Sequence, residues 1–355
     1  MRLSSRKALS LMRRFLTPNA PIHAQWFLTD RCNYKCRSCG VWRSKKPHFE
    51  LPTEEVKAGL DALEKVGVAE IVLSGGNPLL REDIDEIIEY ASRRFITTVY
   101  DNGSMALRKM GALRYADFVA ISLDTLDDKK NDYMRGTKGA WKKSMEAIEK
   151  LHEDGVFVGV APTISQLNLC EMEGFTRYFV EKGIPVWYAV YSHDYSEGSL
   201  FGIGDRNDEL EIVDKEGMVK LCDVLISMKR DMSGVFITDK TLLALRELFL
   251  TGSRTWKCRA LQNFVMVNNR GEAAGCHLYA PVVKVTELPE VWNSKRFDSL
   301  RAQYNNCQRC TYMCYLFYSV HRGIFGSIEI LRDQLKNAKS FFSEPQEPER
   351  PITCS

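Results

Sequence analysis

Apolar positions recur with two different periods along the chain. Val56, Leu60, Leu63 and Val66 follow one another at intervals of three or four residues, which is the spacing of one face of an α-helix. Short and nearly continuous apolar segments lie between such patterns, and they are typical of buried β-strands. The patterns predict strands over 25–29, 68–74, 95–100, 118–123, 156–164 and 185–190, and helices over 53–66, 84–91, 104–114, 139–153 and 171–182.

Strands and helices alternate in this prediction. Such alternation predicts an α/β fold with a parallel sheet, whose strands are joined by right-handed helical crossovers. We expect Thr53 to cap the first helix and Gly67 to end it. In barrels built this way the active site lies at the carboxyl ends of the strands. The residues that follow each strand are therefore the candidates for chemistry.

The pattern changes after the sixth predicted strand. A loop rich in glycine and polar residues covers 196–211, helical patterns cover 214–230 and 239–250, and a hairpin over 264–276 turns at Asn268–Gly271. We expect five regions: a basic amphipathic segment over 1–21, an α/β core over 22–200, a helical linker over 201–255, a small cysteine-containing domain over 256–316, and an apolar tail with a disordered end over 317–355.

Composition narrows the class of protein. A chain of 355 residues is long enough for one large domain or two. A net charge of +3 is too small to favour nucleic acid as a partner, and no apolar run is long enough to span a membrane. Arg13 and Arg14 interrupt the apolar part of the N-terminus, which argues against a secretory signal. Eleven cysteines without such a signal predict a cytoplasmic location and bound metal.

The composition of the two ends of the chain raises the question of whether the protein contacts a membrane surface. Five basic residues alternate with six apolar ones over 2–16, and a basic amphipathic helix can lie on an anionic membrane surface. The alternatives are a helix that covers the bottom of the core and a frayed terminus. The apolar tail after residue 315 either caps the core or forms, with the N-terminal helix, an entrance for a lipid or hydrophobic peptide.

Three thiols lie within eight residues at Cys32, Cys36 and Cys39, directly after the first predicted strand. A [4Fe–4S] cluster is normally held by four cysteine thiolates, so three ligands from one loop predict a cluster with one open iron. One alternative is a structural zinc site, whose fourth ligand would be His23, His48 or a distant cysteine. The other is a chance cluster of cysteines that bind no metal.

Polar groups follow several other predicted strands. Glycines let the backbone approach a ligand closely, an arginine offers two donors to a carboxylate, and tyrosine and histidine can donate protons. A simple turn is the alternative at each glycine-containing site. The candidates are Gly75, Gly76, Asn77 and Pro78 after strand two, Asn102 after strand three, Ser122, Asp124 and Arg135 after strand four, and Tyr191 and His193 after strand six.

A second group of cysteines occurs near the C-terminus. Cys258 and Cys276 lie at the outer ends of the predicted hairpin, and Cys307, Cys310 and Cys314 follow with the spacing C-x2-C-x3-C. Five thiols compete for the four positions of one metal centre. From this spacing alone, zinc is nearly as good an interpretation as iron–sulfur.

Taken together, these motifs resemble the radical S-adenosylmethionine (radical SAM) enzymes with a SPASM or twitch extension. The resemblance implies a partial (β/α)6 barrel, in which Cys32, Cys36 and Cys39 hold a [4Fe–4S] cluster whose open iron binds SAM. It implies SAM contacts for the strand-end residues: Gly75, Gly76, Asn77, Pro78, Asn102, Ser122, Asp124 and Arg135. It also implies an auxiliary [4Fe–4S] cluster at the second cysteine group. Two positions depart from the family pattern: Asn77 replaces the usual Glu, and Ser38 replaces an aromatic residue.

The family resemblance implies a function. SAM would be cleaved reductively to a 5′-deoxyadenosyl radical, which abstracts hydrogen from an unreactive C–H bond of a peptide, a protein, an isoprenoid or a membrane lipid. Tyr191 and His193 would serve as donors to the substrate, and an external ferredoxin- or flavodoxin-type protein would supply electrons. The rival hypothesis is a non-enzymatic iron–sulfur or zinc protein that serves electron transfer or scaffolding.

Overall fold

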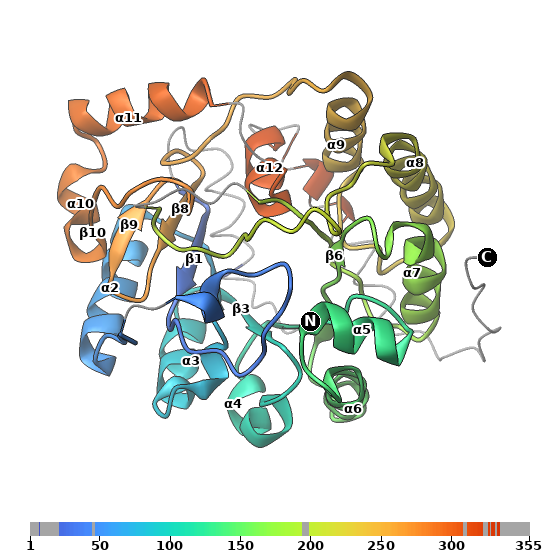
Figure 1. Cartoon of the computed structure of the whole chain (residues 1–355). Helices are drawn as coiled ribbons and strands as arrows, with labels where there is room; N and C mark the ends of the chain where they lie inside the picture. Colours follow the sequence, from blue (N-terminus) through green and yellow to red (C-terminus); the bar gives the residue numbers. More distant parts are fainter. Residues whose placement is uncertain are drawn as a thin grey trace.

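An eight-stranded sheet forms the centre of the molecule (Figure 1). The computed structural model describes residues 7, 21–44, 47–193, 199–307, 311–321, 326, 328–330 and 332–333. The strand order is β10-β9-β8-β1-β2-β3-β4-β5, and β8 and β1 to β5 are parallel. The strands are β1 His23–Phe27, β2 Glu70–Ser74, β3 Ile96–Asp101, β4 Phe118–Ile121, β5 Val158–Val160, β8 Phe264–Val267, β9 Glu272–Ala274 and β10 Val283–Lys284.

Helices alternate with β1 to β5 as predicted. The first helix buries Val56, Leu60 and Leu63 and ends at Gly67, whose φ of 103° is the left-handed conformation that glycine accepts. Thr53 does not cap this helix: Pro52 holds that position, and the Thr53 hydroxyl donates to Asp83 at 2.7 Å. The helices are α2 Thr53–Val66, α3 Ile84–Ser92, α4 Met110–Leu113, α5 Asp128–Arg135, α6 Ala140–Glu153, α7 Met172–Glu181, α8 Lys215–Asp231, α9 Asp239–Thr251, α10 Leu288–Val291, α11 Lys295–Asn305 and α12 Met313–Val320.

The last two predicted strands are shorter than expected. The segment 156–164 forms β5 and a separate β6 (Thr163–Ile164), because Pro162 lacks the N–H that a continuous ladder needs. In the segment 185–190 only β7 (Ala189–Val190) is a strand, and it pairs with β6. Val186 forms single bridges to Val160 and Val235. The curved sheet therefore stays a partial barrel, which confirms the predicted fold class.

The hairpin of the second cysteine group belongs to the same sheet as the core. β8 pairs in parallel with β1, with His23 opposite Phe264 and Trp26 opposite Val267, and β9 pairs antiparallel with β8. The Trp26 indole N–H donates to the carbonyl of Asn268 at 3.0 Å. This pairing places the hairpin directly beside the strand that leads into the first cysteine loop.

Helix α12 packs across the open side of the barrel (Figure 1). Tyr318 stacks on His23 of β1 with ring centroids 4.3 Å apart, and Phe317 packs against Trp187, 6.0 Å away, just before β7. Every residue from Tyr315 to Val320 is buried. These residues are therefore core, which favours a cap over an entrance for this part of the tail.

The two segments that raised the question of a membrane are mostly not described by the structure. The amphipathic segment 1–20, apart from Lys7, and the tail 334–355 lie outside the described residues. Within the described ranges, no helix has both the length and the apolar character needed to cross a bilayer.

Candidate functional site

The first cysteine loop follows β1 at the carboxyl end of the sheet. Hydrogen bonds shape it: the Trp42 indole donates to the Cys36 carbonyl at 2.9 Å, and the Arg37 N–H donates to the Met134 carbonyl at 2.9 Å. The thiols of Cys32, Cys36 and Cys39 are reduced and partly buried. The three thiols come from one loop of eight residues, so the described chain supplies three cysteine ligands at this end of the sheet. In a [4Fe–4S] cluster each thiolate would bind a different iron.

Burial controls the protonation of these thiols. It raises the pKa of Cys36 to about 11 and the pKa of Cys39 to about 12; neighbouring thiols add to both shifts, and Arg135 opposes them. The metal-free loop is therefore protonated at neutral pH. Because a metal ligand must be a thiolate, loading of this loop releases protons.

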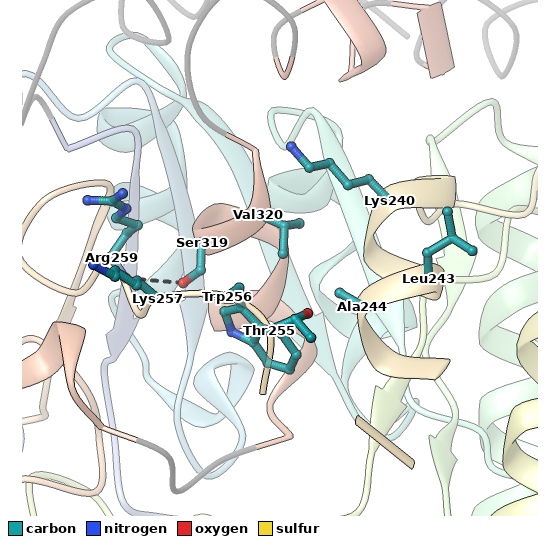
Figure 2. A pocket seen from close by; sticks show the side chains of 9 residues that line it. All are labelled: Lys240, Leu243, Ala244, Thr255, Trp256, Lys257, Arg259, Ser319 and Val320. Carbon is teal, nitrogen blue, oxygen red and sulfur yellow. Dashed lines mark hydrogen bonds between the residues drawn. The ribbon is translucent and has the colours of Figure 1, made fainter. Parts of the chain in front are cut away.

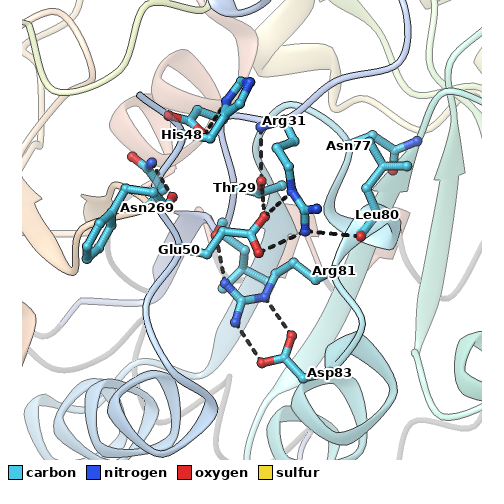
Figure 3. A network of polar contacts seen from close by, with 12 residues as sticks. Thr29, Arg31, His48, Glu50, Asn77, Leu80, Arg81, Asp83 and Asn269 are labelled. Carbon is cyan, nitrogen blue, oxygen red and sulfur yellow. Dashed lines mark hydrogen bonds and ion pairs between the residues drawn. The ribbon is translucent and has the colours of Figure 1, made fainter. Parts of the chain in front are cut away.

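Polar contacts hold the base of the cysteine loop (Figure 3). Arg31 Nε and Nη2 donate to the two oxygens of Glu50 at 2.7 and 2.9 Å, and the Thr29 hydroxyl donates to the same carboxylate at 2.5 Å. Beneath them, the buried Arg81 donates to the carbonyls of Leu28 and Leu51 at 3.1 and 2.8 Å. Since residues 31 and 50 flank the loop, the ion pair closes its two ends.

The glycine turn after β2 packs directly against this loop. Gly76 N–H donates to the Thr29 carbonyl and Asn77 N–H donates to the Arg31 carbonyl, both at 2.7 Å. A Cβ on Gly76 would lie 2.1 Å from the Arg31 oxygen, and a Cβ on Gly75 2.4 Å from the Thr29 oxygen, so only glycine allows the approach. No described donor reaches the carbonyls of Gly75 and Gly76. They remain able to accept from a ligand.

Three asparagines and a serine form one hydrogen-bonded cluster under the loop. Asn77 Nδ2 donates to Asn102 Oδ1 at 3.1 Å, while Asn77 Oδ1 accepts from the Leu79 N–H at 3.0 Å. Asn102 Nδ2 donates to Asn33 Oδ1 at 2.9 Å and lies 4.0 Å from the Cys32 sulfur. Ser104 completes the cluster through Asn33 at 2.8 Å. Asn77, which stands where the family has Glu, thus links the cysteine loop to the ends of β2 and β3.

Arg135 approaches the loop from the last turn of α5. Its Nη2 donates to Asp124 Oδ1 at 2.7 Å, and Asp124 also accepts from the Thr163 N–H at 2.8 Å. Burial opposes the charge of Arg135, but Asp124 and Cys36 outweigh it and raise the pKa of the guanidinium. Arg135 Nε is buried without an acceptor in the described chain. The Ser122 hydroxyl also makes no hydrogen bond there, so both groups can serve a bound anion.

Tyr191 and His193 lie together after β7. Their rings stack with centroids 6.0 Å apart. The Tyr191 hydroxyl donates to the Asp205 carbonyl and accepts from the Asn207 N–H at 2.7 Å, and burial raises the pKa of the phenol. Tyr191 therefore anchors the following loop, and a role as donor to a substrate remains a prediction for both residues.

The second cysteine group is more deeply buried than the first. Cys258 and Cys276 are 6% and 5% exposed, and Cys307 is half-buried. Tyr304 of α11 lies among them: its hydroxyl accepts from the Gly275 N–H at 3.2 Å, and burial together with ionised Cys276 and Cys258 raises the pKa of its phenol. Burial likewise raises the pKa of Cys258, with a contribution from Cys307.

Arg254 marks this second site as one that accepts negative charge. Its guanidinium lowers the pKa of Cys258 against the effect of burial, and it lies 5.2 Å from the ring centre of Trp256. Its Nε and Nη2 are buried without an acceptor in the described chain. A cluster held by thiolates is an anion, so the unsatisfied donors fit one.

Cys314 lies on the barrel side of this region. It is partly buried. Burial raises the pKa values of Tyr100 and Tyr318, and the charge of Cys314 would add to both shifts. Cys310 lies outside the described residues. The structure therefore places Cys258 near Cys307, and Tyr304 near both Cys258 and Cys276. Cys314 lies near Tyr100 of β3.

The sequence did not single out the residues that support these sites. One feature of the sequence could have indicated Arg31 and Glu50: residues of opposite charge flank the cysteine loop. No feature of the sequence indicated supporting roles for Asn33, Ser104 and Arg254, because their partners come from other strands and loops.

Family models match two parts of the chain. Residues 26–179 match the radical SAM superfamily, and residues 258–315 match SPASM, an iron–sulfur cluster-binding domain. The two matched segments coincide with the two cysteine sites described above.

Individual relatives agree with this division. Fe-coproporphyrin III synthase of Methanosarcina barkeri is 33% identical over 51% of this chain and 46% of its own. The antilisterial bacteriocin subtilosin biosynthesis protein AlbA of Bacillus subtilis is 27% identical over 50% of this chain and 41% of its own. The chain thus spans less than half the length of either relative.

A solved structure shows the same fold. SuiB of Streptococcus suis bound to its precursor peptide SuiA superposes with a TM-score of 0.62 at 16% identity, over 84% of this chain and 70% of that chain. Both family models therefore match in register with the two cysteine sites: residues 26–179 form a radical SAM domain and residues 258–315 form a SPASM domain, and the cofactors of these domains are SAM and [4Fe–4S] clusters.

Proposed function

We propose that this protein is a radical SAM enzyme that abstracts hydrogen from a C–H bond of a peptide. When bound, the cluster and SAM supply a 5′-deoxyadenosyl radical through one-electron cleavage of SAM. One observation carries the proposal: the thiol loop, the open carbonyls of Gly75 and Gly76, and the buried Arg135 meet at one end of the sheet.

Each residue has a task in this proposal. Cys32, Cys36 and Cys39 hold the cluster. The carbonyls of Gly75 and Gly76 accept from the amino group of SAM, and Arg135 and Ser122 donate to its carboxylate. Asp124 keeps Arg135 charged and oriented through the 2.7 Å contact. Asn77 and Asn102 support the loop from below, and Pro78 begins the short helix that Asn77 caps.

The barrel interior favours a peptide over an isoprenoid. Along β3, Thr98 and Tyr100 alternate with the fully buried Thr97 and Val99, so they face away from the helices and into the barrel. Gln25 also faces inward and donates to Ser74 at 3.0 Å. The β4 partners of Thr98 and Tyr100 on the same face are Phe118 and Ala120, which form a small apolar cluster. A lining that combines hydroxyls and an amide with apolar surface suits a peptide, which presents a polar backbone and apolar side chains together. A relative named for bacteriocin biosynthesis, and a structural neighbour that holds a precursor peptide, support this class.

A tetrapyrrole is the second candidate substrate. It is favoured by the 33% identity to a protein named Fe-coproporphyrin III synthase. Tight porphyrin binding, seen as a shifted Soret band, together with porphyrin-dependent formation of 5′-deoxyadenosine, would favour it over a peptide.

The second site would hold the auxiliary cluster. Cys258, Cys276 and Cys307 are three of its ligands in this proposal, and the fourth is Cys310 or Cys314. The cluster would receive electrons from an external ferredoxin- or flavodoxin-type donor.

Anaerobic reconstitution tests the proposed function. The protein is loaded with iron and sulfide, reduced with dithionite and mixed with SAM, and 5′-deoxyadenosine is the expected product. Cys36→Ala should abolish that product. Cys222→Ala is the matched control, because Cys222 is a buried thiol of α8 outside both sites. A protein that binds only zinc and leaves SAM intact would establish the non-enzymatic alternative.

A further inference from the structure

A groove of about 460 Å³ lies between α9, the segment 255–259 and α12 (Figure 2). Three cationic side chains line it: Lys240 from α9, and Lys257 and Arg259 from the connecting segment. Trp256 and Leu243 supply apolar surface between them, and Leu243 is 54% exposed. None of these residues belongs to the strand ends where Cys32, Gly75 and Arg135 lie.

The groove is basic. Its described lining contains no aspartate or glutamate. Two acids lie beside it: Glu329 accepts from the backbone N–H of Lys240 at 3.0 Å, and Asp239, which precedes Lys240, pairs with Lys229 at 3.1 Å. Arg259 Nη1 donates to the amide of Gln262 at 2.9 Å. A concave surface lined by one sign of charge attracts partners of the opposite sign and raises their rate of association.

The groove lies directly over a ligand of the second metal site. Cys258 stands between Lys257 and Arg259 in the chain. Ser319, which lines the groove, accepts from the Arg259 N–H at 3.2 Å (Figure 2). Its hydroxyl also hydrogen-bonds to the Cys258 thiol. The Cys258 thiol is therefore one hydrogen bond away from a side chain that lines the groove.

We propose that the groove of Lys240, Lys257 and Arg259 is the docking surface for a small acidic electron-transfer protein. This rests on the proposed function and adds the place where electrons enter. The reduced donor loses one electron and the oxidised auxiliary cluster gains it, without a change in bonds or protons. Electron transfer falls steeply with distance, so a donor must sit beside a cluster ligand. Such complexes are small, weak and charge-steered.

The test measures reduction of the clusters separately from SAM cleavage. Reduced flavodoxin is mixed with the reconstituted full chain, and the second-order rate of cluster bleaching is followed at several salt concentrations. For the native chain the rate should fall as salt rises. Lys240→Glu with Lys257→Glu should lower the low-salt rate by about ten-fold or more and weaken flavodoxin binding. Lys143→Glu, an exposed charge change on α6, should alter neither.

Further variants keep the outcome decisive. Lys240→Gln with Lys257→Gln should give an intermediate rate, and all variants should load the same iron and be reduced equally by dithionite. Equal flavodoxin rates and binding in the native and Glu variants would overturn the proposal. A KM for a peptide substrate that is higher in the Glu variant than in the native chain, with dithionite as the reductant, would also overturn the proposal. That result would assign the groove to an acidic part of the substrate. Failure of dithionite-driven SAM cleavage in the native chain would instead overturn the proposed function, while the cluster-reduction rates still test docking.

Discussion

The two cysteine sites are built in opposite ways. Cys32, Cys36 and Cys39 come from eight consecutive residues, whereas Cys258, Cys276 and Cys307 span fifty and meet only through the hairpin and α11. Polar side chains surround the first site, and the deeply buried thiols and Tyr304 define the second. A polar, partly open site can admit a charged cosubstrate, and a buried site suits a cluster that only passes electrons.

The ion pair at the first site offers the largest expected effect. Arg135→Ala would leave Asp124 buried without its cation, and removing one partner of a buried pair costs about 3–5 kcal/mol. Chemical denaturation of the metal-free chain measures this cost. Arg114→Ala is the control, because Arg114 and Asp154 form a pair of which Arg114 is 60% exposed, and such pairs contribute about 1 kcal/mol or less. Equal losses would refute the assigned burial of Arg135.

The glycine turn is the next most sensitive element. Gly76→Ala places a Cβ 2.1 Å from the Arg31 oxygen, so the turn must move away from the cysteine loop. We expect a loss of about 2 kcal/mol, as for overpacked sites, with less iron retained at the first site. Gly174→Ala in α7 meets nothing within 4 Å and should instead stabilise by about 0.5–1 kcal/mol. Unchanged iron in Gly76→Ala would contradict the close packing.

The hydrogen bond between Tyr304 and Gly275 tests whether the second site is stabilised independently of the first. Tyr304→Phe removes the acceptor of the Gly275 N–H, and an unsatisfied buried donor costs about 1–3 kcal/mol. The auxiliary cluster should be lost more readily on chelation, while the first cluster stays, as monitored by Mössbauer spectra. Tyr115→Phe, at a side chain 53% exposed, should change neither quantity. Loss of both clusters together would show that the sites are not independent.

The smallest effect concerns pH. The folded pKa values of Cys36 and Cys39, about 11 and 12, exceed the ordinary value of 9.0. A raised pKa stabilises the fold while the thiol is protonated, so this contribution is complete below pH 9 and is lost as pH rises toward 11 or 12. Urea denaturation of the metal-free chain at pH 8 and 10.5 should show the decline. The double variant Cys36→Ser with Cys39→Ser should lose less stability between these two pH values. An identical decline in the native chain and the variant would disprove the raised pKa values of these two thiols.

Local patterns were sufficient for much of the fold. The helical period of Val56, Leu60 and Leu63 and the spacing of Cys32, Cys36 and Cys39 are properties of neighbouring residues, and both led to correct expectations. The fifth strand was predicted too long because its apolar pattern continues through Pro162, whose missing N–H breaks the ladder. Helix α5 was overlooked because its composition is polar, although Asp127 caps it by accepting from Lys130 at 2.8 Å.

The sequence by itself determined the fold class and the two cysteine motifs of the family, since period and spacing survive without knowledge of the fold. Only the tertiary structure decided how those residues are supported. It joined β8 to β1, set Asn77 against Asn102, and placed a basic groove over Cys258. The physical reason is distance along the chain: Trp26 and Asn268 are bonded across 242 residues, and no local pattern specifies a partner that far away.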